Sequence, residues 1–303
     1  MGLYAWELSL VFVTYFLLLI WSEVFLLDWH PLFMQHRTVN STFIQSRAGS
    51  LASLPLQRQV VLTVLLPPGY DQSAQQYSLL LVNDGQDFER LQLKTCLETM
   101  MRRREIPPMV VVGVHANERR LSEYGTAGLP DYKGRGNLAA AYTRFVMDEL
   151  IPHLEHSYRI NGEKRYFAGF SLGGLSALDI CWANDGYFAG VGVFSGSLWW
   201  RSRAYDEGYD DENDRIMHVR IRNSDTRPAL RFWFQAGTDD EQEDRNQNGV
   251  IDAIDDTLDL MRELRVKGYR ENDDYTYLEV SGGQHNPETW GAAFPEFLRW
   301  ICR

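Results

Sequence analysis

The sequence is poor in cysteine and in basic charge. Its three cysteines, Cys96, Cys181 and Cys302, are too widely spaced for a zinc site, and at least one must be unpaired within the chain. We therefore expect free thiols rather than a disulfide framework. The chain has 30 lysines and arginines against 41 aspartates and glutamates, a net charge of −11. No basic stripe could displace counterions from phosphates, which argues against a nucleic-acid partner.

Basic residues are also missing ahead of the one long hydrophobic run. Residues 8–27 are almost continuously apolar and long enough to span a membrane. No Lys or Arg precedes them and no small-residue cleavage site follows, although a signal peptide requires both. Glu7, Glu23 and Asp28 are costly near or within a membrane span. Three alternatives stay open for residues 1–37: a membrane anchor, an atypical export signal, or a start codon assigned too far upstream.

The rest of the chain has no repeats, no low-complexity tract and no interdomain linker, so we expect one domain over residues 38–303. Strands and helices alternate, which predicts an α/β fold with a mainly parallel central sheet and helices on both faces. We expect strands at 42–46, 59–66, 77–82, 109–114, 165–170, 187–195, 231–236 and 275–280, and helices at 88–103, 139–154, 257–267 and 290–301. The segment 116–137 is predicted to be a long loop, and 196–229 an insertion over the sheet.

Gly169-Phe170-Ser171-Leu172-Gly173 is the centre of the sequence. It follows a predicted strand and precedes small and apolar residues at helical spacing, as a nucleophilic serine on a strand–turn–helix does. A serine on such a tight turn leaves no room for a Cβ two residues before or after it. An ordinary strand-to-helix turn gives the same pattern. Whether Ser171 is a nucleophile therefore depends on the residues at the other strand ends.

An acid and a histidine follow Ser171 at two later strand ends, in the order serine, acid, histidine of an α/β-hydrolase. His285 has the intrinsic pKa to take the serine proton and return it to the leaving group. Asp240 is the first choice for the carboxylate that orients the imidazole, with Asp239 and Glu241 next. These positions predict a catalytic triad.

The oxyanion of such a reaction needs two N–H donors. We expect one from the backbone of Leu172, and the other from the turn after strand 77–82, at Gln86 or, as the alternative, Asp87. Trp199 and Trp200 follow another strand end, and we expect one of them to wall the substrate pocket.

Several further motifs carry a family resemblance. They are Leu66–Tyr70, Asp84–Gln86, Gly169–Gly174, Phe194–Ser197, Gly237–Asp240 and Gly283–Asn286 with Trp290. Through them residues 42–303 resemble the branch of the α/β-hydrolases that contains esterase D, the enterochelin esterases and the feruloyl esterases. The resemblance implies hydrolysis of carboxylic esters without a cofactor. Feruloyl-type members carry their acid in a Gly-Thr-x-Asp motif, which favours Asp240.

A loop beyond Asp240 matches a calcium-binding pattern, with a glycine at its sixth position. The predicted ligands are Asp244, Asn246, Asn248, Val250 through its carbonyl, Asp252 and Asp255. An Asx-rich turn with a helix N-cap is the alternative. A bound calcium would be structural and would brace the loop next to Asp240.

We therefore expect a serine esterase that acts on a small-molecule ester through an acyl-enzyme. An acyltransferase on the same triad and a non-catalytic calcium-binding or membrane-associated protein are the alternatives. The sequence leaves the ester open, and the compartment as well, because the calcium-like loop favours export while the missing basic segment and the unpaired cysteine do not.

Overall fold

The computed structural model describes residues 43–303. The apolar run at 8–27, for which a membrane anchor is one of three alternatives, and the rest of residues 1–37 lie outside the described residues. Between Phe43 and Arg303 no helix is both long enough and apolar enough to cross a membrane.

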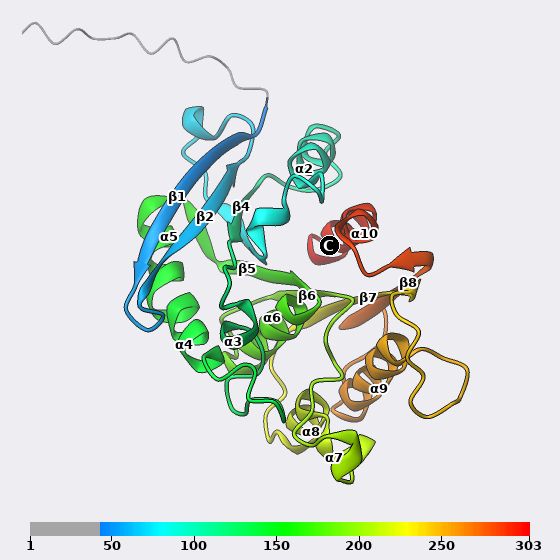
Figure 1. Ribbon diagram of the computed structural model, residues 1–303. Coiled ribbons are helices and arrows are strands. Elements are labelled where there is room, and N and C mark those ends of the chain that lie inside the picture. Colours follow the sequence, from blue (N-terminus) through cyan, green and yellow to red (C-terminus); the bar gives the residue numbers. More distant parts are fainter. Residues whose placement is uncertain (1–42) are drawn as a thin grey trace, which may run out of the picture. The chain divides into compact units, whose positions relative to one another are not determined.

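One eight-stranded sheet organises the described residues, in the order β1-β2-β4-β3-β5-β6-β7-β8 (Figure 1). The β2 strand pairs antiparallel with β1 and β4, and all the other neighbours pair in parallel. The strands are β1 (Gln45–Ser53), β2 (Arg58–Leu66), β3 (Tyr77–Asn83), β4 (Met109–Val114), β5 (Ile160–Phe170), β6 (Gly190–Phe194), β7 (Arg231–Asp239) and β8 (Tyr275–Gln284). Because β3 and β5 to β8 run the same way, their carboxyl ends meet along one edge of the sheet.

Helices cover both faces of this sheet, as the alternation of strands and helices predicts. The helices are α2 (Leu93–Arg102), α3 (Arg120–Glu123), α4 (Ala139–Arg144), α5 (Ile151–Ser157), α6 (Leu172–Ala183), α7 (Asp211–Asp214), α8 (Ile216–Asn223), α9 (Asp252–Val266) and α10 (Pro287–Ile301). Residues of α2 and α10 pack in one core cluster, and residues of α4, α5, α6, α8 and α9 in the other. The predicted fold class is confirmed.

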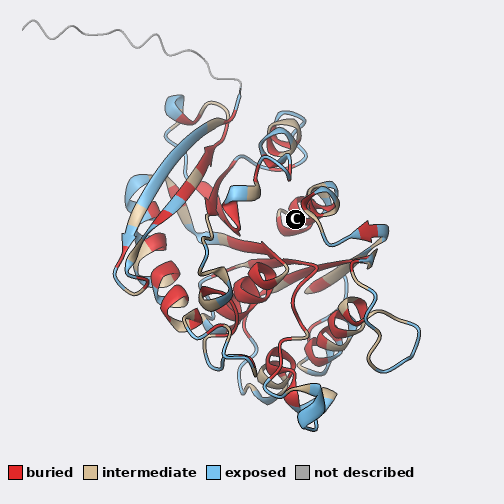
Figure 2. Cartoon of the chain, viewed as in Figure 1, coloured by how far each residue is buried: buried red, intermediate tan, exposed pale blue. Residues whose placement is uncertain are grey.

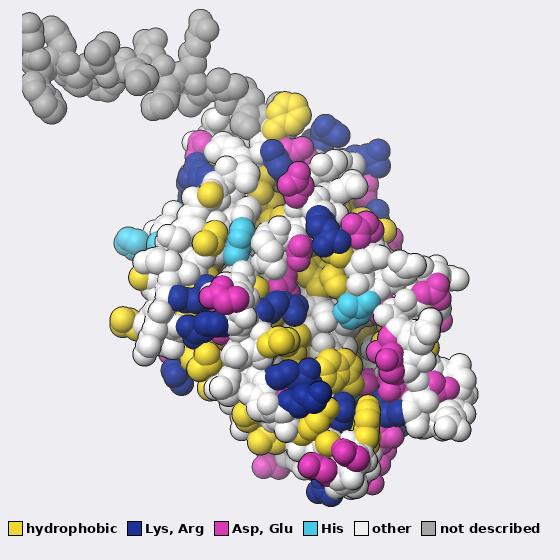
Figure 3. Space-filling model, viewed as in Figure 1, with side chains coloured by type: hydrophobic (Ala, Val, Ile, Leu, Met, Phe, Trp, Pro, Cys, Tyr) yellow, Lys and Arg dark blue, Asp and Glu magenta, His cyan; other side chains and the backbone are white. Residues whose placement is uncertain are grey.

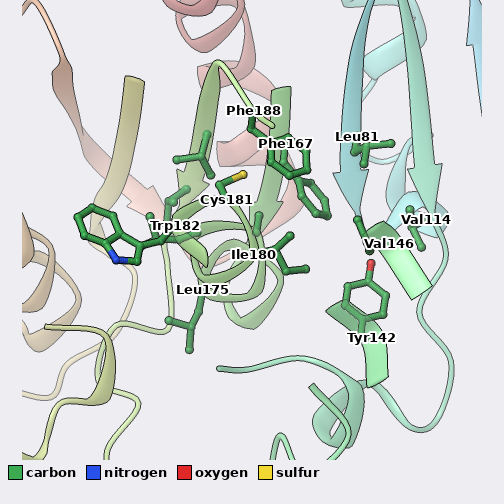
Figure 4. Close-up of a cluster of buried hydrophobic side chains, with 14 of the residues drawn as sticks. Leu81, Val114, Tyr142, Val146, Phe167, Leu175, Ile180, Cys181, Trp182 and Phe188 are labelled. Carbon is green, nitrogen blue, oxygen red and sulfur yellow. The ribbon is translucent and has the colours of Figure 1, made fainter. Parts of the chain in front are cut away.

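Burial follows the two sides of the strands. In β3, Leu79 and Leu81 face the α6 cluster, whereas Leu80 and Val82 face α10, and all four have 0% exposure. Figure 2 shows this buried layer running through the sheet and the inner sides of the helices. Figure 4 shows the α6 side of it, where Leu175 and Cys181 lie among strand residues such as Phe167. Since both faces are buried, the central strands read as continuous apolar runs.

The helices expected at 257–267 and 290–301 begin earlier in the structure, at Asp252 and Pro287, and the other two predicted helices differ in their course. The helix expected at 88–103 begins at Leu93, because Gln92 has a left-handed backbone (φ 51°) and a 3-10 helix, Gly85–Asp87, precedes it. The helix expected at 139–154 contains a π-helical turn, Phe145–Leu150, between α4 and α5. Pro152 follows this turn, and a proline inside a helix removes one N–H and disturbs the ladder.

The insertion 196–229 packs on the rest of the protein through its helix α8, which contacts α9. Met217 and Ile221 join the main core with 0% exposure. Arg215 is 1% exposed and pairs with Asp256 and Asp259 of α9, each at 2.7 Å. A buried guanidinium held by two carboxylates ties the insertion to the helix behind β7.

Candidate active site

Ser171 lies in a strained turn between β5 and α6. Its backbone (φ 54°, ψ −124°) is outside the regions that residues with a side chain normally adopt, and it is the N-cap of α6. A Cβ on Gly169 would lie 2.2 Å from the carbonyl oxygen of Gly173. The predicted need for glycine on both sides of the serine therefore has a steric cause.

The strained turn is held by the end of β6. Ser171 N–H donates to the carbonyl of Phe194 at 2.8 Å, and Ser197 N–H donates to the carbonyl of Ser171 at 3.1 Å. The hydroxyl oxygens of Ser171 and Ser197 lie 3.4 Å apart, and Ser197 is 3% exposed. The sequence reasoning did not find this role of Ser197. Its position three residues past the end of β6, the strand next to β5, was the available signal.

His285 lies between the end of β8 and the start of α10, where Trp290 packs against it. The two rings meet edge to face with centroids 5.1 Å apart. The Trp290 indole N–H donates to Ser195 Oγ at 2.9 Å, and its ring stacks on Phe170 at 5.2 Å. The residue before Ser171 and the ring beside His285 therefore share one aromatic stack, which the sequence analysis did not assign.

Asp240 follows β7 and turns its carboxylate back toward the chain that leads to His285. Its Oδ2 accepts from Gly237 N–H at 3.1 Å. Its Oδ1 is buried and has no hydrogen-bond partner among residues 43–303. A Cβ on Gly237 would lie 3.0 Å from that oxygen and 2.2 Å from the carbonyl oxygen of Gly283, two residues before His285. One carboxylate oxygen is thus fixed and the other is available to a donor.

The two other acids considered for this role are placed differently. Asp239 is exposed, and its carboxylate accepts from the neighbouring Thr238 hydroxyl at 3.4 Å. Burial raises the pKa of Glu241 to about 7, and this carboxyl faces the backbone of Ala253 in α9. Glu241 Oε1 and Asp240 Oδ1 are both buried without a hydrogen-bond partner among residues 43–303, but of the three acids only Asp240 has a charge that acts on the pKa of His285.

Desolvation by the surrounding protein lowers the pKa of His285 below its usual value. The negative charge of Asp240 raises this pKa and the positive charge of Arg120 lowers it. A lowered pKa favours the neutral imidazole, the form that a general base requires. Within the described residues no hydrogen bond joins His285 to Ser171 or to Asp240. Catalytic hydrogen bonds are often long before a substrate binds and tighten in the complex.

The turn after β3 lies against the first turn of α6. The Asn83 side chain donates to the carbonyl of Gly173 at 2.8 Å, and a Cβ on Gly173 would lie 2.7 Å from Asp84 Oδ2. Asp84 has a left-handed backbone (φ 61°) and leads into the 3-10 helix that contains Gln86. The two segments predicted to supply the oxyanion donors, at Leu172 and Gln86, are therefore packed together.

The two tryptophans of the predicted pocket have different surroundings. Trp200 has 0% exposure and packs against Gly125 and Gly136, so a substrate does not reach it. Trp199 is half-buried, with the Arg135 guanidinium 5.1 Å from the centre of its ring. Figure 3 shows basic side chains beside hydrophobic ones on this face of the molecule. Trp199 stays the candidate for the pocket.

The loop 244–255 forms the Asx-rich turn that was the alternative to a calcium site. Asp244 accepts from the backbone N–H of Asn248 and Gly249 at 3.1 and 2.9 Å. Asp252, the predicted ninth-position ligand, pairs with Arg245 at 3.1 Å. In the described part of the chain no group of three or more His, Cys, Asp or Glu side chains is arranged to hold a metal. The described arrangement therefore does not support the predicted calcium site.

Comparison with known proteins assigns the chain to a family. The family described as "Putative esterase" matches residues 53–301. The chain belongs to this family. The chain is a carboxylic ester hydrolase, and its fold is that of the α/β-hydrolases. This confirms the branch that the sequence motifs indicated.

Two curated relatives of this esterase come from Bacillus subtilis (strain 168). The uncharacterized protein YbbA is 24% identical over 246 residues, covering 79% of this chain and 91% of that protein. The uncharacterized protein YjcH is 24% identical over 244 residues, covering 78% and 89%.

Three solved structures share the fold of this esterase. A ferulic acid esterase superposes with a TM-score of 0.66 at 18% identity, covering 86% of this chain and 98% of that one. The enterobactin esterase FES from Shigella flexneri has a TM-score of 0.65 at 18% identity, and the match covers 85% of this chain but 59% of that one. An IroE-like serine hydrolase from Shewanella oneidensis has a TM-score of 0.65 at 20% identity, covering 84% and 79%.

Proposed function

We propose that this esterase hydrolyses small-molecule esters through a triad of Ser171, His285 and Asp240 and a covalent acyl-enzyme. The observation that carries the proposal is the strained backbone of Ser171, at φ 54° and ψ −124°, in the turn between β5 and α6. A serine in this conformation presents its Oγ at the carboxyl edge of the sheet. The histidine and the acid are supplied at the same edge, by the ends of β8 and β7.

The roles follow from the chemistry of each side chain. Ser171 Oγ attacks the ester carbonyl while His285 takes its proton, and the carbonyl π electrons move onto the oxygen. When the tetrahedral intermediate collapses, the bond to the leaving alcohol breaks and His285 gives the proton to that alcohol. Water then attacks the acyl-enzyme, with His285 again as base, and the carboxylic acid leaves as Ser171 recovers its proton.

Asp240 serves the imidazole rather than the substrate. The buried Oδ1 without a partner is a suitable acceptor for the second ring nitrogen of His285, and its charge already raises the pKa of that ring. A carboxylate in this position fixes the tautomer and stabilises the imidazolium formed during attack.

The negative charge on the carbonyl oxygen needs donors from two directions. Leu172 is the first residue of α6, and the first N–H groups of a helix have no partner inside it. The turn after β3, which contains Gln86, packs against the same end of α6. Both features support the backbone N–H groups of Leu172 and Gln86 as the oxyanion donors.

The structural relatives named for ferulic acid and enterobactin suggest which esters to try. A panel of p-nitrophenyl esters with short, long and aromatic acyl groups is assayed with the wild type and with Ser171→Ala. We expect hydrolysis by the wild type, and a loss of about 10⁴-fold or more in kcat for the variant. Turnover that does not depend on Ser171 would refute the proposal. Adding an alcohol as acceptor and analysing the products separates hydrolysis from acyl transfer.

A further inference from the structure

Arg120, on α3, reaches both segments that are proposed to hold the oxyanion. Its Nε and Nη2 donate to Oδ1 and Oδ2 of Asp84, each at 2.7 Å. The same Nη2 donates to the carbonyl oxygen of Phe170 at 3.3 Å, and Phe170 immediately precedes Ser171. One guanidinium therefore connects the turn after β3 to the turn that holds the nucleophile.

The Asp84 turn depends on such a partner. Asp84 is 2% exposed and sits in a left-handed conformation that favours glycine. Its carboxylate also accepts from the Gln86 side-chain amide at 3.2 Å, while Gln86 Oε1 accepts from Ala116 N–H at 3.0 Å. Without a cation beside it, the buried Asp84 carboxylate would destabilise this strained turn. The turn that contains Gln86 would then no longer be held in its position.

Arg120 is itself presented from a fixed support. The last residue of α3, Glu123, is 1% exposed and pairs with Arg58 of β2 at 2.6 Å. The Arg120 guanidinium also lies 5.2 Å from the centre of the buried Tyr124 ring. The helix α3 is therefore anchored to the sheet. The Arg120 side chain is held by a fixed element rather than by a free loop.

We propose that Arg120 is a positioning residue of this esterase, which holds the turn containing Gln86 against the turn containing Ser171 and so sets the spacing of the two oxyanion donors. The inference rests on the proposed function, because it gives the oxyanion donors their roles. Arg120 does not touch the reacting atoms. It acts through Asp84 on one side and through the Phe170 carbonyl on the other.

Lysine cannot replace this arrangement. The planar guanidinium makes two parallel bonds to a carboxylate and keeps a further N–H for the Phe170 carbonyl. An ammonium is a single point charge, which can pair with Asp84 but does not fix its orientation. Arg120→Lys thus keeps the charge and loses the geometry, whereas Arg120→Met loses both.

The charge of Arg120 gives an independent readout. The charged groups that act on His285 are Asp240, which raises its pKa, and Arg120, which lowers it. Because kcat/KM requires the neutral imidazole, its acid limb reports this pKa. Removing the positive charge should move the acid limb to higher pH, and a lysine at position 120 should leave it where it is.

The test compares Arg120→Met and Arg120→Lys with the matched control Arg119→Met. Arg119 lies next to Arg120 and also pairs with a buried acid, Glu123, at 3.4 Å, but has no contact with the Asp84 turn. With the best p-nitrophenyl ester we expect kcat to fall about 100-fold in Arg120→Met and about 10-fold in Arg120→Lys, with KM nearly unchanged. The Ki of an alkylboronic acid, which mimics the tetrahedral intermediate, should rise by the same factors.

The outcomes are separable. A Ser171-dependent wild type in which Arg120→Met keeps its kcat, or in which Arg119→Met loses as much, overturns the positioning role alone. A wild type whose turnover does not depend on Ser171 overturns the proposed function instead. Thermal melts show whether each variant is folded. If Arg120→Met does not fold, Arg120→Lys decides, since it must lose kcat and boronate affinity together without a change in its acid limb.

Discussion

Glu241 is a half-buried residue next to the proposed triad acid, and replacing it by glutamine tests both the origin of its raised pKa and the assignment of the acid role to Asp240. Its Oε1 is buried without a hydrogen-bond partner among residues 43–303. Burial, and then the nearby charges of Asp252, Glu243 and Asp256, raise its pKa from the ordinary 4.5 to about 7, while a backbone hydrogen bond from Ala253 opposes this. Glutamine has the same shape and can keep that hydrogen bond, but it cannot ionise.

The sign and size of the effect follow from proton binding. Because the folded-state pKa is above the unfolded value, this carboxyl favours folding below pH 4.5 and the advantage disappears as the pH rises to about 7. A difference of roughly 2.5 pKa units at ~1.4 kcal/mol each sets an upper limit of about 3.5 kcal/mol, and partial hydration reduces this to about 1–3 kcal/mol. Above pH 7 the Glu241→Gln variant should be more stable than the wild type by that amount.

Urea denaturation of both proteins at pH 5 and pH 8 measures this difference. We expect the free energies of unfolding to be similar at pH 5, and the variant to be the more stable protein at pH 8. Equal stability of the two proteins at pH 8 would refute the electrostatic reasoning. Esterase activity should be retained by the variant, and a loss as large as that of a triad residue would transfer the role of the acid from Asp240 to Glu241.

Three other predictions address the site. Asp240→Asn should lower kcat by up to about 10⁴-fold. Since the Asp240 charge raises the pKa of His285, removing it should lower this pKa and move the acid limb of kcat/KM to lower pH; an unchanged pH profile would contradict the pairing. Trp290→Phe leaves the buried Ser195 hydroxyl without its hydrogen-bond donor, so we expect the free energy of unfolding in urea to fall by about 1–3 kcal/mol. We also expect a lower kcat, because the Trp290 ring packs against His285; unchanged activity would show that the ring does not orient His285. Calorimetric titration with calcium should give no binding heat, because an arginine already holds the ninth-position carboxylate; heat that disappears in Asp244→Ala would restore the calcium site.

The strands buried on both faces could be predicted well from the sequence. The strand predicted at 109–114 has the same bounds in the structure. A short apolar run that Pro108 precedes and His115 follows is typical of a strand buried on both faces. The first edge strand could not be predicted in full, because Gln45–Ser53 is mostly exposed and its small polar residues give no alternation. It is specified by its pairing with β2 along its whole length.

Some residues of the candidate site could likewise be predicted from the sequence, and others could not. Ser171, His285 and the acids after β7 are found from strand ends, because their order along the chain is local information. The Arg120 pair with Asp84 joins residues 36 apart, and the Trp290 bond to Ser195 joins residues 95 apart. Such contacts depend on how the strand ends are brought together, so one sequence alone does not reveal them.

The central claim is that Ser171 carries the acyl group during turnover. The wild type is mixed with a p-nitrophenyl ester, quenched in acid within the first turnovers, digested, and examined by mass spectrometry. We predict that the peptide containing Ser171 gains the mass of the acyl group, and that Ser171→Ala gains none at any position. An acyl group on another residue, or steady turnover by Ser171→Ala, would contradict the account.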